Sequence, residues 1–397
     1  MKKLSTLALS VALLSGCFDN SDDEQGLDLS NAYIAQLVAA DYSGSEVAAG
    51  NLSGDRSALA GYLSSTQTDF VLDTYKDYVY QIGRFNIDTL TRYDINANLL
   101  QSDYTYSLAD DESSTSNVYQ LIHAADDKAY LLRYGKSDIQ IVDPTADEDN
   151  FVTASIDLSA YNPEGTTAPS MNSGLIIGDK LYVILERQDS SYAPGTAYLV
   201  VIDTTTDTEV TVTAESELKG LALNATNPQR ITTDGTYLYI AGRGDYASNS
   251  GALDRVALSD YTLTNIINGE TLASLNDDQG DEDASNDVYF HVTGVEVLDE
   301  QAFVTINLEN GYSTNSSLLY RVDLNDLSDL TEVTPSIIED KKISLMRTGP
   351  AGETLWVALD DAEAPFMYVF NADLTQNGET IELDSRVSDL EFVVTND

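Results

Sequence analysis

Short segments in which apolar and polar positions alternate recur from residue 31 to the end of the chain. Each copy has an apolar strand containing an aromatic residue, a hairpin rich in Gly, Ser and Asp, a second strand rich in β-branched residues, and a turn with Asp. The alternation Tyr-Leu-Tyr-Ile-Ala at residues 237–241 is typical: its period of two, bounded by Gly and Asp, indicates a strand. The pattern predicts an all-β protein.

Seven copies align on one aromatic position, with intervals that vary because insertions fall in loops. The aligned aromatic residues are Tyr33, Tyr80, Tyr130, Tyr182, Tyr239, Phe303 and Trp356. A further apolar segment precedes most copies, for example residues 119–125 and 343–348, which gives about four strands per copy. Four strands at this repeat length are the content of one propeller blade.

The two ends of the repeat region complement each other. The first copy has no strand before it, and the segment from Val387 has no hairpin after it. We expect this last segment to be the innermost strand of the first blade, because such closure removes exposed sheet edges. The prediction is a seven-bladed β-propeller over residues 31–397, with a pair of β-sandwiches as the alternative.

The repeat resembles the YVTN/NHL-like class of bacterial propellers in its aromatic strand, its Gly/Ser hairpin and a strand that ends in Val-Asp or Ile-Asp. That ending places Asp143, Asp203 and Asp323 in turns. Since Asp readily accepts hydrogen bonds from backbone N–H groups in turns, we expect these residues to form turns rather than to bind ligands. The resemblance implies the fold and leaves the function open.

The N-terminal residues carry a different pattern. Lys2 and Lys3 precede an apolar run at residues 4–14, followed by Leu-Ser-Gly and Cys17, the single cysteine of the chain. This order resembles a bacterial lipoprotein signal, which implies cleavage before Cys17 and lipidation of that residue; an ordinary signal peptide is the alternative. The apolar run is too short to remain as a transmembrane helix.

We therefore expect a signal peptide at residues 1–16 and an acidic tether at residues 17–30. Phe18 follows the cysteine where the familiar inner-membrane retention signal has Asp, so we expect a lipid anchor in the outer membrane, facing either side.

Charge restricts the partners. The chain has 66 acidic and 20 basic residues, a formal net charge of −46. The charge disfavours nucleic acid as a partner, and none is predicted, because phosphate binding requires clustered Lys and Arg. The acidity favours solubility of a monomer, with a cationic partner as the alternative. A hydrophobic content of 42% indicates a folded chain.

Two residue types recur at the predicted hairpins. In a four-stranded meander, the hairpin between the second and third strands shares one face with the links between blades. The recurring residues are Tyr42, Tyr192, Tyr246 and Tyr312, and Arg84, Arg133, Arg187 and Arg243. Tyrosine offers a rigid apolar surface with a hydroxyl, and arginine binds carboxylate or phosphate through its fork of donors. We predict a binding rim; packing of each Tyr on its own loop and pairing of each Arg with nearby carboxylates are the alternatives.

Metal chemistry has weak candidates. His123 and His291 lie in expected innermost strands and could reach the central channel, as ligands or as core residues. The acidic run at residues 276–287 contains Asp277, Asp281 and Asp283, oxygen donors suited to Ca²⁺. Its glycine is out of phase with an EF-hand loop, so the sequence favours a solvated insertion over a Ca²⁺ site. No other cofactor is predicted.

The chain has no Gly-x-Ser-x-Gly elbow, P-loop, His-Glu-x-x-His or haem-attachment motif. The sequence therefore favours a non-enzymatic module that binds a small ligand or an envelope protein. Such a module resembles propeller lipoproteins with two known roles. One is a substrate-capturing lid on an outer-membrane transporter, and the other is a scaffold in barrel assembly. The alternatives are a divalent-metal-dependent hydrolase of the lactonase type at the channel, and a purely structural surface protein.

Overall fold

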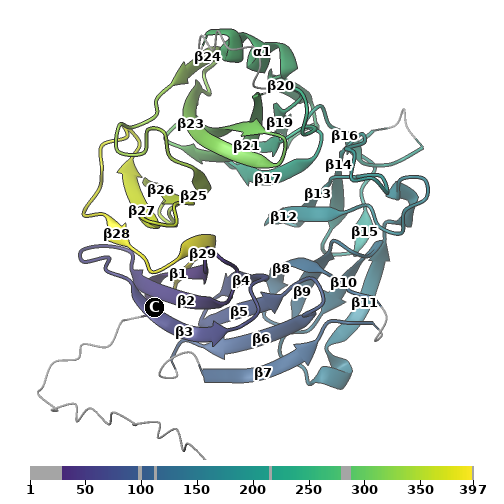
Figure 1. The fold of residues 1–397 in the computed structure, drawn as a ribbon. Helices are drawn as coiled ribbons and strands as arrows, with labels where there is room; N and C mark the ends of the chain where they lie inside the picture. The colour runs from purple at the N-terminus through teal and green to yellow at the C-terminus, as the bar shows by residue number, and fades with distance from the viewer. Residues whose placement is uncertain (1–28, 97–100, 111–113, 214–216, 279–287, 396–397) are drawn as a thin grey trace, which may run out of the picture.

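Seven antiparallel sheets stand around a common axis in the computed structural model (Figure 1). The structure describes residues 29–96, 101–110, 114–213, 217–278 and 288–395. The predicted seven-bladed β-propeller is confirmed, and the alternative of two β-sandwiches is wrong. We number the blades 1 to 7 along the chain.

Each blade is a meander whose strands follow one another in order from the innermost to the outermost. Blade 1 contains β29 (Arg386–Val394), β1 (Asn31–Val38), β2 (Ser45–Asn51) and β3 (Leu59–Ser65). Blade 2 contains β4 (Phe70–Tyr75), β5 (Tyr78–Gly83), β6 (Thr89–Asp94) and β7 (Gln101–Ser107). Blade 3 contains β8 (Val118–Ala125), β9 (Lys128–Arg133), β10 (Asp138–Val142) and β11 (Val152–Asp157).

Blade 4 contains β12 (Met171–Ile177), β13 (Lys180–Leu185), β14 (Tyr198–Asp203) and β15 (Thr208–Glu209), with β16 (Leu221–Ala222) also paired to β14. Blade 5 contains β17 (Pro228–Thr233), β18 (Tyr237–Gly242), β19 (Ala252–Ala257) and β20 (Leu263–Ile267). Blade 6 contains β21 (Tyr289–Leu298), β22 (Gln301–Asn310), β23 (Ser313–Asp323) and β24 (Asp326–Glu332). Blade 7 contains β25 (Ile343–Thr348), β26 (Thr354–Leu359), β27 (Phe366–Asn371) and β28 (Ile381–Glu382).

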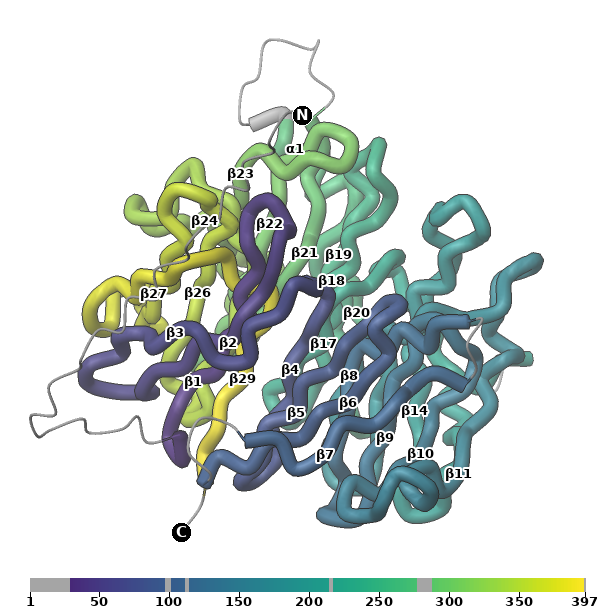
Figure 2. Tube along the Cα trace, turned by 60° about the horizontal axis from the view of Figure 1, so that its bottom comes forward, coloured from purple at the N-terminus to yellow at the C-terminus, as the bar shows by residue number. Residues whose placement is uncertain are grey.

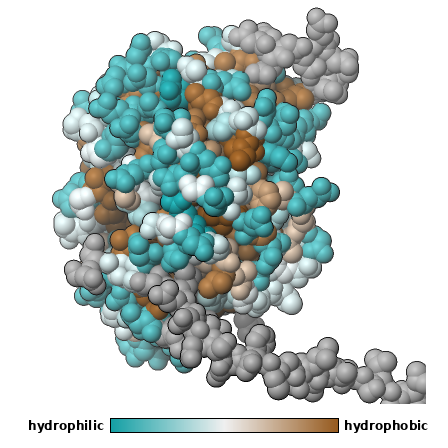
Figure 3. All heavy atoms as spheres, turned by 90° about the vertical axis from the view of Figure 1, so that its left-hand side faces the viewer, coloured by the Kyte–Doolittle hydropathy of each residue, from teal (hydrophilic) through white to brown (hydrophobic). Residues whose placement is uncertain are grey.

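The core lies between the blades. The aligned aromatic residues all occupy the second strand of their blade and are all buried. They join hydrophobic clusters that each connect two neighbouring blades; in the blade 7–1 cluster, the Trp356 ring lies 5.4 Å from that of Tyr33 and 5.3 Å from that of Phe392. Burial of apolar area at every blade interface stabilises the ring without disulfides. The outer side of the ring at blades 6, 7 and 1 is mostly hydrophilic (Figure 3).

Closure of the ring uses the last strand of the chain, as predicted. β29 pairs with β1 from Asn31 opposite Val394 to Val38 opposite Arg386, and the two strands lie side by side in Figure 2. The innermost strands β4, β8, β12, β17, β21, β25 and β29 contact one another in a closed cycle. Every innermost strand therefore has neighbours on both sides.

The turns at the strand ends behave as expected. The side chains of Asp143, Asp203 and Asp323 each accept a hydrogen bond, of 2.8–2.9 Å, from the backbone N–H two residues ahead. These Asp residues are turn formers.

Three short helices accompany the described strands: η1 (Glu148–Asn150), η2 (Ser159–Tyr161) and α1 (Gly269–Asp278). α1 links blades 5 and 6 and buries Leu272, and it reaches into the acidic run that the sequence presents as a solvated loop. No helix in the described ranges is long and apolar enough to cross a membrane.

The two ends of the ring differ. Loops between the second and third strands of each blade share one end with the links to the next blade, and we call this end the loop face. Ser30, which precedes β1, lies at the opposite end, where its carbonyl accepts a hydrogen bond from the N–H of Thr395. The predicted signal peptide, Cys17 and most of the predicted tether lie outside the described residues.

Candidate functional site

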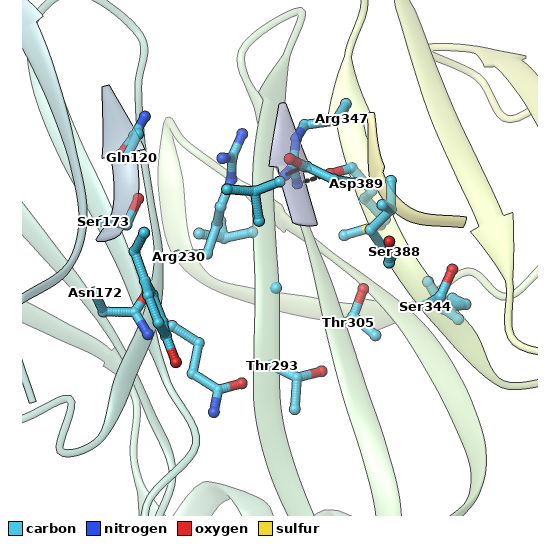
Figure 4. A pocket seen from close by; sticks show the side chains of 18 of the residues that line it. Gln120, Asn172, Ser173, Arg230, Thr293, Thr305, Ser344, Arg347, Ser388 and Asp389 are labelled. Carbon is cyan, nitrogen blue, oxygen red and sulfur yellow. Dashed lines mark hydrogen bonds and ion pairs between the residues drawn. The ribbon is translucent and has the colours of Figure 1, made fainter. Parts of the chain in front are cut away.

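The innermost strands surround a polar cavity of about 450 Å³ that opens toward the loop face. Side chains from all seven blades line it, and most of them carry amide, hydroxyl or charged groups. Figure 4 labels Gln120, Asn172, Ser173, Arg230, Thr293, Thr305, Ser344, Arg347, Ser388 and Asp389. A cavity of this size, with convergent polar groups on a rigid scaffold, suits a small hydrophilic ligand.

Two arginines in the cavity are each held by one carboxylate. Arg230 of β17 donates from Nε to Glu296 Oε1 across 2.8 Å, and Arg347 of β25 donates from Nη2 to Asp389 Oδ1 across 3.1 Å. Arg347 also donates from Nη1 to its neighbour's carbonyl, while its Nε has no partner among the described residues. Since a guanidinium carries five donors, both arginines keep donors for a ligand.

Two further carboxyl groups line the same cavity. Asp73 accepts a hydrogen bond of 2.7 Å from the Leu121 N–H, and burial, followed by the charge of Glu391, raises the pKa of Asp73 well above its usual range. Glu391 is partly accessible through the cavity and has no side-chain hydrogen bond to a described residue. Enclosure by protein and the charge of Asp389 raise the pKa of Glu391 to about 8, against the opposing charges of Arg347 and Arg230.

One side of the cavity mouth is aromatic. The Arg84 guanidinium lies 4.6 Å from the centre of the Tyr119 ring and donates from Nε to Asp69 across 2.8 Å. Tyr119 stacks on Tyr134 at 4.5 Å, and the Tyr134 hydroxyl donates to the buried Glu186 across 2.6 Å. Burial raises the pKa of Glu186 to about 7, although this hydrogen bond lowers it. Cation–π and stacking contacts thus fix Arg84 and Tyr119 at the mouth.

The other side of the mouth holds Arg243. Its guanidinium forms an ion pair with the buried Glu309 and lies 4.4 Å from the centre of the Tyr246 ring. His291 is fully buried behind it, with Nδ1 3.0 Å from the Arg243 carbonyl oxygen and Nε2 4.0 Å from Glu309 Oε2. Burial lowers the pKa of His291, so its imidazole is neutral at pH 7.

The predicted rim arginines separate into two groups. Arg84 and Arg243 both line the cavity mouth. Arg133 is buried, with 2% of its side chain exposed, and forms ion pairs with Asp110 and Asp138. Arg187 donates to the carbonyls of Tyr161, in the link from blade 3, and of Thr196, in its own hairpin. Arg84, Arg133 and Arg243 are each paired with a carboxylate, whereas Arg187 is held by backbone carbonyls. A binding role for the four arginines stays a prediction.

The predicted rim tyrosines all lie in hairpins of the loop face. Tyr42, Tyr192 and Tyr312 are 60%, 74% and 86% exposed, and Tyr312 lies 4.6 Å from Tyr246, centre to centre. Tyr246 and Tyr312 thus meet across two neighbouring blades, and none of the four tyrosines lines the central cavity. Their role in binding also stays a prediction.

The metal candidates have simpler surroundings. His123 stacks on Tyr75 at 4.2 Å and does not line the cavity; burial lowers its pKa to about 4. Asp281 and Asp283 fall outside the described residues, and Asp277 lies in α1 with its side chain not described. Among the residues that the structure describes, no group of three His, Cys, Asp or Glu side chains could hold a metal ion. The predicted metal sites stay predictions.

Sequence reasoning missed the charged residues of the cavity: Asp73, Arg230, Arg347, Asp389 and Glu391. The available signal was a charged residue inside an otherwise apolar innermost strand. Arg347 in Ile343–Thr348 is the clearest case, since such a charge needs a polar surrounding to be tolerated.

No protein-family model matches the chain, and no curated protein matches it. Solved structures do share its fold. A protein from Lactobacillus plantarum, 13% identical, covers 91% of this chain and 99% of its own, with a TM-score of 0.59. A putative 6-phosphogluconolactonase from Bacteroides fragilis, 13% identical, covers 93% of this chain and 99% of its own, with a TM-score of 0.57. The periplasmic gluconolactonase of Pseudomonas aeruginosa, 12% identical, covers 92% of this chain and 100% of its own, with a TM-score of 0.58. Identities this low show a common fold alone.

Proposed function

We propose that the central cavity binds a small polyhydroxylated sugar acid or its lactone and hydrolyses the lactone ring. The observation that carries the proposal is the meeting of Arg230 and Arg347, with donors to spare, and the carboxyl of Glu391, free of hydrogen bonds to described residues, in one polar cavity. Arginine donors suit a carbonyl or carboxylate oxygen, and the surrounding amides and hydroxyls suit sugar hydroxyls. The hydrolase alternative drawn from the sequence thus becomes the leading function, without its metal requirement.

The chemistry assigns one role to each group. Glu391, as carboxylate, accepts a proton from a water molecule while the water oxygen bonds to the lactone carbonyl carbon. The carbonyl electrons move to its oxygen, where the donors of Arg347 and Arg230 stabilise the developing charge. The ring carbon–oxygen bond then breaks, and the proton passes from Glu391 to the leaving ring oxygen. The product is the open-chain hydroxy acid, which releases one proton at neutral pH.

Two fold neighbours support the choice of substrate, since their names state a gluconolactonase and a putative 6-phosphogluconolactonase. They contribute the suggestion of a lactone only; the residues and their roles come from the cavity of this chain. D-glucono-1,5-lactone is the first substrate to test.

We expect the purified mature protein to accelerate hydrolysis of D-glucono-1,5-lactone with saturation kinetics. The measurement is proton release followed with an indicator dye, after subtraction of the spontaneous rate. D-gluconate, as product, is expected to inhibit competitively and to raise the melting temperature. Absence of both acceleration and a thermal shift, with this lactone and with D-galactono-1,4-lactone, would refute the proposal.

The proposal also places the protein in the cell envelope, anchored through lipidated Cys17 in the outer membrane. Ser30 and the loop face lie at opposite ends of β1, so a tether from Cys17 would leave the cavity mouth directed away from the membrane. We expect Cys17→Ser in the precursor to shift the protein from the membrane pellet to the soluble fraction. Fractionation with labelled palmitate checks this, and a variant that stays in the membrane pellet would contradict the anchor.

A second candidate function is the binding module that the sequence favours, which would capture an envelope protein through the loop face. The observation in its support is the exposure of Tyr42, Tyr192 and Tyr312 on separate hairpins. Exposed aromatic residues are common at recognition surfaces. Both functions use the same end of the ring and are compatible.

A further inference from the structure

A second hollow, of about 470 Å³, lies on the loop face outside the central cavity. It is formed by the β1–β2 hairpin, the link between blades 6 and 7, the β26–β27 hairpin and the start of β29. We call it the blade-7 groove; its lining residues are Ala40, Tyr42, Asn315, Asp340, Lys341, Lys342, Asp360, Asp361, Ala362 and Arg386. Three cations face three carboxylates in this groove, whereas the whole chain has 20 basic and 66 acidic residues. Charge in the groove is thus balanced in a strongly acidic protein.

An aromatic ring and a guanidinium are held together at one side of the groove. The Arg386 guanidinium lies 4.7 Å from the centre of the Tyr42 ring, and its Nη1 donates to Asp360 across 3.3 Å. Asp360 is the only described residue that accepts a hydrogen bond from the Arg386 guanidinium, so the second N–H of Nη1 and both N–H groups of Nη2 have no described acceptor. Arg386 therefore retains donor capacity beside an aromatic surface.

Tyr42 is held outside the core at a conformational cost. Its backbone is left-handed, with φ of 56°, in a turn closed by its own N–H and by the Asp41 side chain, which accepts from the Ser43 N–H across 3.0 Å. The side chain is nevertheless 60% exposed. A left-handed backbone is unfavourable for a large side chain, so this turn holds Tyr42 at a conformational cost.

One ammonium in the groove is free of partners from the described part of the chain. Lys341 forms an ion pair of 2.9 Å with Asp361, as Arg386 does with Asp360. Lys342, by contrast, has no side-chain hydrogen bond or ion pair with the described residues, and only its backbone carbonyl is used, by the Asp360 N–H. A ligand anion between Lys342 and Arg386 would meet unused donors from both.

We infer that the blade-7 groove binds a carboxylate-bearing sugar unit, such as the uronic acid of an acidic saccharide. The apolar C–H face of a pyranose ring packs on an exposed tyrosine, and its carboxylate suits Lys342 and the remaining donors of Arg386. A simple anion would not need Tyr42, and a neutral sugar would not need Lys342. This inference is independent of the chemistry proposed for the central cavity.

The test is calorimetric titration of the full mature protein with trigalacturonic acid at low ionic strength. We expect saturable binding that weakens about tenfold in Lys342→Gln and in Tyr42→Ala, a loss of about 1.4 kcal/mol for each. Lys342→Arg, which keeps the charge, is expected to retain binding. D-gluconate, directed at the central cavity, is not expected to compete.

Tyr192→Ala is the matched control. Tyr192 has the same left-handed backbone, is 74% exposed and lines a hollow of about 350 Å³, but no Lys or Arg from the described residues lines that hollow. Its replacement should leave the affinity for trigalacturonic acid unchanged. The inference is overturned by no binding, by equal affinity for maltotriose, or by equal affinity for inorganic phosphate together with insensitivity to Tyr42→Ala.

Discussion

Glu391→Gln is expected to lower kcat for lactone hydrolysis by about 10²- to 10⁴-fold, the range that general base catalysis contributes. Glutamine has nearly the same shape as glutamate but cannot accept the proton of the attacking water. The KM should change little, because Arg230 and Arg347 remain. The measurement is the blank-corrected rate of proton release for the variant and the wild-type protein.

The pH dependence gives this prediction a second readout. Only the ionised form of Glu391 acts as base, and its pKa is raised to about 8, so kcat of the wild-type protein should rise as the pH increases through about 8. The contribution of Glu391 to the stability of the fold changes in the opposite direction as the pH rises. A carboxyl whose pKa is higher in the folded than in the unfolded state stabilises the fold at low pH, and this contribution is lost between its ordinary value of 4.5 and about 8.

Glu391→Gln removes that ionisation, so the variant should melt at a higher temperature than the wild-type protein at pH 9 while remaining inactive. Glu382→Gln, at an exposed position in the outermost strand of blade 7, is the control and should alter neither activity nor stability. A Glu391→Gln enzyme with full activity would show that another group is the base. Asp73 would be the next candidate, because it is a second carboxyl in the cavity with a raised pKa.

The blades could be predicted because each one repeats a local pattern. Trp356 and Tyr33 occupy equivalent positions in the last and first copies, and the turn residue Asp203 accepts a hydrogen bond from the backbone N–H two residues ahead. Alternation and turn chemistry act over a few residues, so they are readable from the sequence. The missing strand at one end and the unpaired strand at the other then predicted closure.

The cavity could not be predicted in the same way. Asp73, Arg230 and Glu391 lie far apart in the sequence and line one cavity only because the blades close into a ring, and no local pattern encodes that convergence. The edges of the innermost strands face the cavity, so consecutive residues such as Asn172 and Ser173 both line it, and a period of two does not identify the lining.

The surroundings of individual polar residues were equally hidden. His123 lies in an innermost strand as expected, yet its ring packs against Tyr75 of the neighbouring blade. The position of Arg133 at a predicted hairpin suggests an open rim, but Asp110 and Asp138 supply carboxylates that accommodate it in the interior. A single sequence does not show which charges are paired.

Removal of residues 386–397 is expected to prevent formation of the propeller. β29 is the innermost strand of blade 1, and it supplies the buried Val387, Leu390 and Val393 to the clusters on both sides of that blade. Without it, the edge of β1 that faces the axis is unpaired. The innermost strands of blades 7 and 2, β25 and β4, also lose the strand that both of them contact. Size-exclusion chromatography and near-ultraviolet circular dichroism of the truncated chain provide the measurement.

Point variants in β29 show how much of this loss of stability comes from its buried side chains. Leu390→Ala, at a fully buried position, should lower the free energy of unfolding by about 2–5 kcal/mol. Val394→Ala, at a position 43% exposed, should change it by no more than about 0.5 kcal/mol. Urea unfolding of the two variants distinguishes loss of packing from a general sensitivity of the strand.

A circularly permuted chain tests whether the propeller needs β29 at the end of the chain or needs only the presence of this strand. Because the N–H of Thr395 already bonds to the Ser30 carbonyl across 2.9 Å, residues 386–397 can be placed before residue 29 through a short turn, which gives blade 1 the same connection as the other blades. This permutant should fold and retain lactone hydrolysis, since Asp389 and Glu391 return to the cavity. If the truncated chain folded as well as the permutant does, the ring would not depend on β29. Closure by the last strand would then not be what stabilises this propeller.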